Sequence, residues 1–296
     1  MNGSAVLYAL ILLMVAFWSG NYIAGKIALR ELSPLFLAGL RIGLAGVMML
    51  PLYAWEVARN RDRSLMVAAR HDVVRLLMLG MLGVTLNQFF FIVGLSRTSV
   101  AHAAILIGLT PIQVLIIAGL RGQERITARK TVGMAVALAG VAALKAFEPA
   151  AATGATWLGD FFILLTGLCF ALFTVFGKEV TRQYSTITMN TYAYVGGAVA
   201  LLPLTLWEAA RQPLAHVSAG AWLAAIYMAL GPSVIAYLIY YHALSHMTAS
   251  RVSAFSYLQP IFASIMGVVI LGESLGAPVI AGGAVILTGV YLAERG

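Results

Sequence analysis

Long apolar stretches separated by short polar ones dominate this chain. A membrane hydrocarbon core about 30 Å thick is crossed by about 20 mostly apolar helical residues. Ten stretches of about that length are largely free of charged residues, and they run roughly over 5–25, 34–55, 76–96, 98–120, 127–147, 157–177, 185–207, 218–242, 247–271 and 275–294. The pattern predicts an all-α, polytopic membrane protein with ten transmembrane helices. The stretches 34–55 and 127–147 are the weakest of the ten, because basic residues interrupt them.

The second half of the chain repeats the first at an offset of 149 positions, which takes Leu95 to Leu244. Residues 94–143 align without a gap with residues 243–292, and about a quarter of the positions are identical. The identities include residues that chance rarely pairs in apolar segments: Pro111 with Pro260, Glu124 with Glu273, Gly133 with Gly282 and Gly140 with Gly289. Duplication of this kind is typical of transporter folds with a site near the bilayer midplane.

Each repeat contains five segments, so the second copy must enter the membrane from the opposite side. The sequence therefore predicts two inverted five-helix repeats, residues 1–147 and 148–296. With the amino terminus inside, 13 basic residues flank the segments on the cytoplasmic side and 5 on the outer side, while Arg41 lies within the membrane. Basic residues accumulate on the cytoplasmic side of membrane proteins, which places both termini there.

The composition agrees with a membrane protein, since 61% of the residues are apolar and only 10% are charged. The net charge of +8 is explained by this topology and by contact with anionic membrane lipid, so no nucleic-acid partner is expected. The first apolar run follows four residues that carry no basic cluster, and we interpret it as a retained helix.

The chemistry-bearing residues favour transport over catalysis. Cys169 is the only cysteine, and the five histidines show no metal-ligand spacing, so neither a metal nor another cofactor is expected. Hydrolase elbows and nucleotide-binding loops are absent from the sequence, and the protein is predicted not to be an enzyme. All eleven acidic residues fall at or beyond segment ends. Since coupled carriers commonly place a carboxylate near the midplane, uniport is favoured, with histidine-based proton coupling or a backbone-coordinated ion left open.

Several motifs then carry a resemblance to a known family. They are Phe17-Trp18-Ser19-Gly20-Asn21-Tyr22, Ser33-Pro34 leading to Leu40-Arg41, Leu109-x-Pro111, and the loops that contain Gly122-Gln123-Glu124 and Leu271-Gly272-Glu273. In this order and in two copies they resemble EamA-type members of the drug/metabolite transporter (DMT) superfamily, in particular YddG-like exporters of aromatic amino acids and related metabolites. The resemblance implies a basket of ten helices around a central cavity, formed mainly by the first, third, fourth, sixth, eighth and ninth.

Helical spacing then selects residues that could line such a cavity, because polar side chains in a membrane helix turn inward or serve helix packing. The candidates for substrate binding are Trp18, Asn21, Tyr22, Asn87, Gln88, Phe91, His102, Thr110, Phe173, Tyr237, Tyr241, Ser253, Tyr257 and Gln259. Packing is the alternative role for each of them. Pro111 and Pro260 should break their helices at matching depth and are candidate hinges, a static kink being the alternative.

Together these features predict an inner-membrane exporter of small metabolites, most of all amino acids with aromatic side chains favoured, that works by alternating access and uniport. One alternative is an exporter of other small solutes or drugs by proton antiport. A membrane enzyme or a scaffold acting on lipid intermediates is the alternative from a different class. The expected partners are a small-molecule substrate and membrane lipid, and a monomer is favoured.

Overall fold

The computed structural model describes residues 3–59, 70–98, 103, 106–146, 156–181, 183–259, 261–262, 265–266 and 277–296, and these ranges contain helices and connecting turns but no strand. Within them, six helices are long and apolar enough to cross a membrane. They are α1 (Gly3–Ala28), α2 (Pro34–Arg59), the run of α3 (Arg70–Gly80), η2 (Met81–Leu86) and α4 (Asn87–Arg97), α8 (Trp157–Val180), α9 (Thr186–Ala209), and the run of α10 (Ala219–Met228), η4 (Ala229–Ile235) and α11 (Ala236–His246). The prediction of an all-helical membrane protein is confirmed by these six helices.

The other four predicted segments correspond to shorter or incompletely described helices. They contain α6 (Thr110–Leu120), α7 (Ala128–Ala146), α12 (Ala249–Ala254) followed by the 3₁₀ turn η5 (Phe255–Leu258), and α14 (Ala277–Glu294). A further 3₁₀ turn, η3 (Leu214–His216), lies in the connection between α9 and α10.

Small polar residues fix where several of the helices begin. Thr156, Ser185 and Ser218 precede α8, α9 and α10, and each accepts a hydrogen bond from the backbone N–H three residues further on. Ser33 does the same for Phe36 at the start of α2, where Pro34 occupies the first helical position. These side chains satisfy backbone donors that the helix leaves without partners. Proline is tolerated at the first helical position because an N–H group there would have no partner within the helix.

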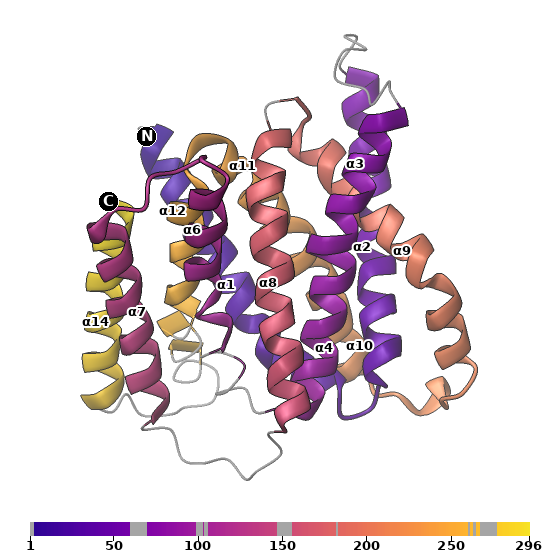
Figure 1. The fold of residues 1–296 in the computed structure, drawn as a ribbon. Helices are drawn as coiled ribbons and strands as arrows, with labels where there is room; N and C mark the ends of the chain where they lie inside the picture. Colours follow the sequence, from indigo (N-terminus) through magenta and orange to yellow (C-terminus); the bar gives the residue numbers. More distant parts are fainter. Residues whose placement is uncertain are drawn as a thin grey trace.

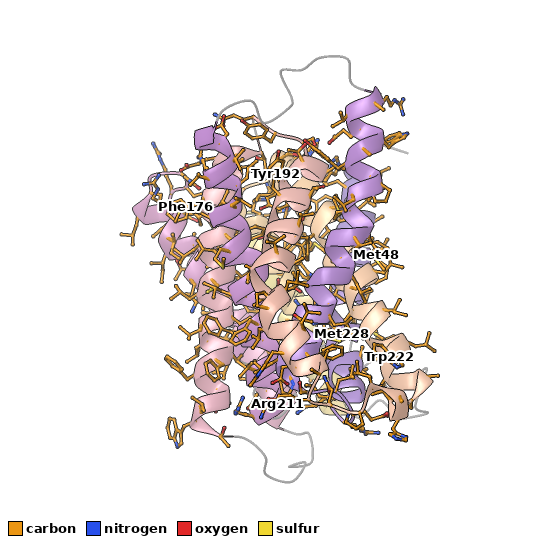
Figure 2. The ribbon with its side chains drawn as sticks, turned by 90° about the vertical axis from the view of Figure 1, so that its right-hand side faces the viewer. Met48, Phe176, Tyr192, Arg211, Trp222 and Met228 are labelled. Carbon is orange, nitrogen blue, oxygen red and sulfur yellow. The ribbon has the colours of Figure 1, made fainter. Side chains whose placement is uncertain are left out.

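The helices pack as an upright bundle in which segments from the two halves of the chain alternate (Figure 1). The contacts pair α7 with α14, α2 with α9, α4 with α8, and α1 with both α10 and α11. Both termini lie at the same end of the bundle. Seen from the side, Arg211 and Trp222 lie near the opposite end from Tyr192 and Phe176 (Figure 2).

The α7–α14 pair at one edge of the bundle is held by direct backbone contact (Figure 1). A Cβ atom added to Gly133 would lie 2.4 Å from the amide nitrogen of Ala293, and one added to Gly289 would lie 2.3 Å from that of Ala137. Glycine is therefore required at both positions, because it alone lets the two backbones approach this closely.

Two π-helical stretches interrupt the third and eighth predicted segments at corresponding places. The stretch η2 ends at Leu86 and η4 ends at Ile235, a separation of 149 positions that equals the repeat offset. A π turn inserts one extra residue into a helix and frees backbone groups from their usual partners. Both stretches lie beside the central cavity.

Candidate functional site

A cavity of about 90 Å³ lies at the centre of the bundle. Its walls come from both halves of the chain and consist of Trp18, Asn21, Tyr22, Arg41, Asn87, Gln88, Phe91, Ile107, Thr110, Thr166, Gly167, Phe170, Tyr237, Ser256 and Gln259. The volume is several times that needed by one buried water, and many of the lining groups are polar, so the cavity can be hydrated.

Aromatic rings form one wall of the cavity. The indole ring of Trp18 lies 5.7 Å from the ring of Phe170 and 6.2 Å from that of Tyr237, both in edge-on arrangements. Tyr22 and Phe91 form a second edge-on pair at 5.6 Å. Such pairs are favourable beyond simple burial, so the wall is a preformed apolar surface.

Carbonyl groups of the two π stretches hold this wall in place. The Nε1–H of Trp18 donates to the carbonyl oxygen of Pro232 in η4 at 3.2 Å, and the hydroxyl of Tyr237 donates to that of Gly83 in η2 at 2.8 Å. Positions 83 and 232 are separated by the repeat offset of 149. Each π stretch therefore fixes one aromatic side chain that borders the cavity, Trp18 for η4 and Tyr237 for η2.

Polar side chains on the other walls differ in whether their bonding capacity is used. Asn87 donates to the carbonyl of Thr166 at 3.0 Å, and Gln88 donates to the hydroxyl of Tyr194 at 2.8 Å, so these two amides connect helices. In contrast, Asn21 Oδ1 and Thr110 Oγ1 are buried and have no hydrogen-bond partner among the described residues. Unpaired buried acceptors are costly, and these two are available to a ligand.

One full charge also borders the cavity. Arg41, in the second turn of α2, is 3% exposed, and its Nε–H donates to the hydroxyl of Ser233 at 2.8 Å. The Ser233 hydroxyl in turn lies 2.9 Å from the carbonyl of Met228 and 3.4 Å from Gln88 Oε1. A cation therefore lies at the junction of α2, η2–α4 and η4.

The structure brings nine of the candidate residues to this cavity: Trp18, Asn21, Tyr22, Asn87, Gln88, Phe91, Thr110, Tyr237 and Gln259. Four others lie outside its lining. Phe173 and Tyr241 pack against each other with ring centroids 5.1 Å apart, the hydroxyl of Ser253 donates to the carbonyl of Ser250, and Tyr257 is fully buried. All four side chains are buried, and the hydroxyl of Tyr257 has no hydrogen-bond partner among the described residues. His102 and Pro260 lie outside the described residues.

Pro111 lies in the first turn of α6, after a break in the helix at residues 108–109. Its position costs no hydrogen bond, since the first helical residues lack intrahelical partners for their N–H groups. The 3₁₀ turn η5 begins at Phe255, which the offset of 149 relates to Leu106, so helix geometry is irregular at matching depth in both halves.

The candidate list omitted six lining residues: Arg41, Ile107, Thr166, Gly167, Phe170 and Ser256. For Phe170 a signal existed, because aligning the segments 5–25 and 157–177 from their first residues places it opposite Trp18, and it is also aromatic. Arg41 also carried a signal, as the one charge deep inside a predicted segment. Its importance depended on a contact with Ser233, 192 positions away, which local pattern does not reveal.

No group of three or more His, Cys, Asp or Glu side chains that could hold a metal ion occurs among the described residues. The rings of His242 and His246 lie 4.5 Å apart at the end of α11, and His246 bonds the carbonyl of His242. The thiol of Cys169 is buried. The polar chemistry of the described cavity therefore comes from amides, hydroxyls and one guanidinium group.

Two lysines make matching contacts beyond the ends of the cavity. Lys26, in the last turn of α1, donates to the carbonyls of Leu95 at 2.7 Å and Thr98 at 2.9 Å. Lys178, in the last turn of α8, donates to the carbonyls of Leu244 and Met247. The accepting residues are related by the repeat offset, and in each case a cation meets the carbonyl end of a helix, where it is favoured. We call these two contacts the lysine clamps.

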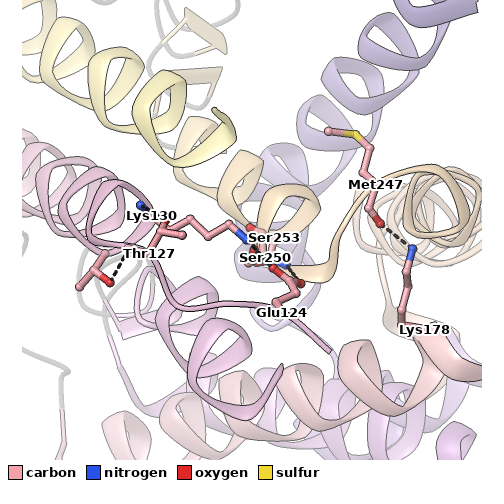
Figure 3. A network of polar contacts seen from close by, with 8 residues as sticks. Glu124, Thr127, Lys130, Lys178, Met247, Ser250 and Ser253 are labelled. Carbon is pink, nitrogen blue, oxygen red and sulfur yellow. Dashed lines mark hydrogen bonds and ion pairs between the residues drawn. The ribbon is translucent and has the colours of Figure 1, made fainter. Parts of the chain in front are cut away.

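Beside the Lys178 clamp lies a buried ion pair (Figure 3). Glu124 and Lys130 approach to 2.8 Å with side chains only 4% and 7% exposed. Glu124 also accepts from the backbone N–H and the hydroxyl of Ser250 in the first turn of α12. Burial alone would raise the pKa of the Glu124 carboxyl, but the bonds from Lys130 and Ser250 outweigh it and lower that pKa below its usual value.

Comparison with known proteins gives a consistent result over the whole chain. The model of the EamA-like transporter family matches residues 5–145 and again 157–294. The chain is 28% identical over 291 residues to an "uncharacterized transporter" of Archaeoglobus fulgidus, covering 96% of each protein. It is 26% identical over 296 residues to a "probable terminal-alkyne amino-acid exporter" of Streptantibioticus cattleyicolor, covering all of this chain and 95% of the relative. A crystal structure matches its fold with a TM-score of 0.78 at 17% identity, over 98% of this chain and 97% of the other.

Proposed function

We propose that this multi-pass membrane protein, which belongs to the EamA-like transporter family, exports small metabolites across the bacterial inner membrane. Amino acids are the favoured substrates, and among them those with aromatic side chains. The observation that carries this proposal is the cavity, where an aromatic wall faces polar groups whose bonding capacity is unused. The relative from Streptantibioticus cattleyicolor, named as a probable amino-acid exporter, supports the choice of substrate class.

We further propose that the chain forms ten transmembrane helices in two inverted repeats, residues 1–147 and 148–296, which rock about the cavity in alternating access. The two separate matches to the family model support this division. The lysine clamps support the inversion, since α1 and α8 end at opposite ends of the bundle while their lysines make matching bonds (Figure 1). Both termini would be cytoplasmic.

A counterflow assay in liposomes that contain only this protein tests the proposed substrates. A panel of amino acids, nucleosides and cations should show exchange of aromatic amino acids above all. Trp18→Ala should weaken transport of these substrates roughly three- to tenfold relative to small aliphatic ones, since an aromatic pair adds roughly 0.5–1.5 kcal/mol. Trp157→Ala is the matched control, because Trp157 is 94% exposed and lies far from the cavity lining. Unchanged aromatic selectivity in a folded Trp18→Ala protein would contradict the proposed site.

Uniport is tested in the same liposomes without any ion gradient and with a protonophore present. Downhill flux should persist, because the acidic residues of the sequence lie at or beyond segment ends. Strict dependence on a proton gradient would favour the antiport alternative and direct attention to His102.

Orientation is tested by cysteine labelling in a Cys169→Ala background. A cysteine in place of Arg295 should react with an impermeant reagent only from the cytoplasmic side, and one in place of Arg30 only from outside. Opposite accessibility would contradict the proposed topology.

A further inference from the structure

Arg41 is a buried cation that has no anionic partner among the described residues. Among the described residues, the four ion pairs that the structure contains involve other side chains, and Arg41 forms a single hydrogen bond, through Nε to Ser233. The phenol groups of Tyr194, Tyr227 and Tyr237 lie near it, and phenols are neutral at physiological pH. A charge inside a membrane helix is expensive and is normally paired, so this one calls for an explanation.

A purely structural role leaves most of the guanidinium unused. The group has five N–H donors in a planar fork that matches a carboxylate, and the bond to Ser233 uses one of them. That bond fixes the Nε side, because Ser233 itself is held by the carbonyl of Met228. The two terminal nitrogens belong to a residue that lines the cavity, and they remain for a ligand.

The same cavity offers acceptors that could take a positive group. Asn21 Oδ1 and Thr110 Oγ1 are buried in its lining and have no partner among the described residues. The cavity thus combines a charged donor, separate neutral acceptors and an aromatic wall that contains Trp18 and Phe170. This combination complements a zwitterion with an apolar side chain. Charge-assisted pairing between a guanidinium and a carboxylate is among the strongest polar contacts.

We propose that Arg41 binds the carboxylate of the transported substrate and makes that carboxylate a requirement for transport. The inference rests on the proposed export of amino acids and adds the chemical group that is recognised. The ammonium group then lies toward Asn21 and Thr110. Removing the carboxylate leaves Arg41 buried and unpaired, which disfavours binding of amines and amides with the same side chain.

The test uses three matched probes in proteoliposomes: phenylalanine, phenylalaninamide, which lacks the carboxylate, and 3-phenylpropionate, which lacks the ammonium group. In the wild-type protein, 3-phenylpropionate should compete with labelled phenylalanine, whereas phenylalaninamide should be weaker by roughly 10- to 100-fold, the worth of one charge-assisted hydrogen bond. This comparison needs no substitution and so does not depend on the folding of a variant.

Variants of Arg41 sharpen the result. Arg41→Gln should lower phenylalanine transport roughly 10- to 100-fold and abolish the preference over the amide, while Arg41→Lys, which keeps the charge but not the fork, should retain part of it. Arg211→Gln is the control, since Arg211 lies over the Trp207 ring at 4.3 Å, away from the cavity lining. Thermal midpoints in detergent identify any variant that fails to fold.

Two failures are distinguishable. If the wild-type protein carries phenylalanine and phenylalaninamide equally well, or if folded Arg41→Gln keeps the wild-type ratio between them, the role of Arg41 is wrong while amino-acid export stands. If the wild-type protein carries none of the amino acids in the panel, the proposed function fails, and the inference built on it fails as well.

Discussion

Glu31 and Glu124 make the same pair of hydrogen bonds in very different surroundings. They follow α1 and α6, which end at opposite ends of the bundle (Figure 1). Glu31 accepts from the backbone N–H and the hydroxyl of Ser218, both at 2.6 Å, where α10 begins. Glu124 accepts from the same two groups of Ser250, where α12 begins. Glu31 is exposed, whereas Glu124 is buried against Lys130. The hydrogen bonds are alike, so any difference in their importance comes from burial and from the paired cation.

The pKa of both carboxyls is lowered, but for different reasons. For Glu31 the hydroxyl and backbone bonds from Ser218 lower the pKa against only a small effect of burial. For Glu124 burial raises the pKa, and the bonds from Lys130 and Ser250 more than reverse it. Losing the Glu124 charge therefore has two consequences, because it removes a helix cap and leaves Lys130 buried without a partner.

The largest expected effect is the difference in unfolding free energy between Glu124→Gln and Glu31→Gln. Glu124→Gln should lower the free energy of unfolding by about 3–5 kcal/mol, the range for breaking a buried ion pair. Glu31→Gln should change stability little, because water can replace an exposed carboxylate. Thermal and denaturant unfolding in detergent measure both.

A double variant separates the lost pair from the lost cap. Glu124→Gln combined with Lys130→Met removes both charges and should recover much of the stability, since an apolar replacement of a buried pair is often neutral. If the double variant is no more stable than Glu124→Gln alone, the unpaired lysine is not the cause.

The second prediction concerns pH. A carboxyl whose pKa is lower in the folded state stabilises the fold above its unfolded pKa of about 4.3 and loses that contribution as pH falls through the folded pKa. The melting temperature of the wild-type protein should therefore decrease as the pH is lowered below about 4.3. Glu124→Gln should weaken this pH dependence more than Glu31→Gln does. An equal reduction in the two variants would show that burial does not distinguish the two ends.

The third prediction compares the lysine clamps. Lys178→Met should lower the free energy of unfolding by about 1.5–3 kcal/mol, the range for a hydrogen bond to a charged group, and Lys26→Met by less. At the Lys26 end, Thr98 also donates to Asp160 at 2.6 Å, whereas its counterpart Met247 has no hydroxyl. Equal losses in the two variants would mean that the Thr98 bond adds nothing to its end.

The smallest effect is expected for Thr98→Val, which keeps the side-chain shape and removes the hydroxyl. It should cost about 1.5 kcal/mol on its own, the lower end of the range for a hydrogen bond to a charged group, because this bond is only partly buried. The double variant Thr98→Val, Lys26→Met should lose about as much unfolding free energy as Lys178→Met. Thermal and denaturant unfolding of the double variant measure this loss. An additive loss well beyond that value would argue against equivalence of the two clamps.

Much of the fold follows from hydropathy, because apolar length and the absence of charge are local properties. The long helices α1, α2, α8 and α9 begin within a few residues of their predicted starts. The π stretch η2 could not be predicted, since its residues carry no pattern that marks a π turn, whereas Pro232 inside η4 signals an interrupted helix. They are stabilised by partners far along the chain, as Trp18 bonds to Pro232.

The cavity was predictable where several polar or aromatic residues share one helix face. Trp18, Asn21 and Tyr22 do so at i, i+3 and i+4, and all three line the cavity. Phe173 was chosen as a repeat mate of that face and Tyr257 as part of a polar cluster before Pro260, and both are buried outside the described lining. A residue type indicates that a side chain needs an apolar neighbour but not which neighbour it has.

The π stretches also bear on how the chain tolerates changes in length. A π turn holds one residue more than the α-helix it interrupts, so deleting one residue from η2 should relax it into a regular α-helix and leave the two flanking parts in register. The deletion should displace the Gly83 carbonyl that accepts from Tyr237. Single-residue deletions here should leave a protein that inserts and folds but has lost an anchor of its aromatic wall. At these two places the length of the chain is set by the cavity and not by the thickness of the membrane.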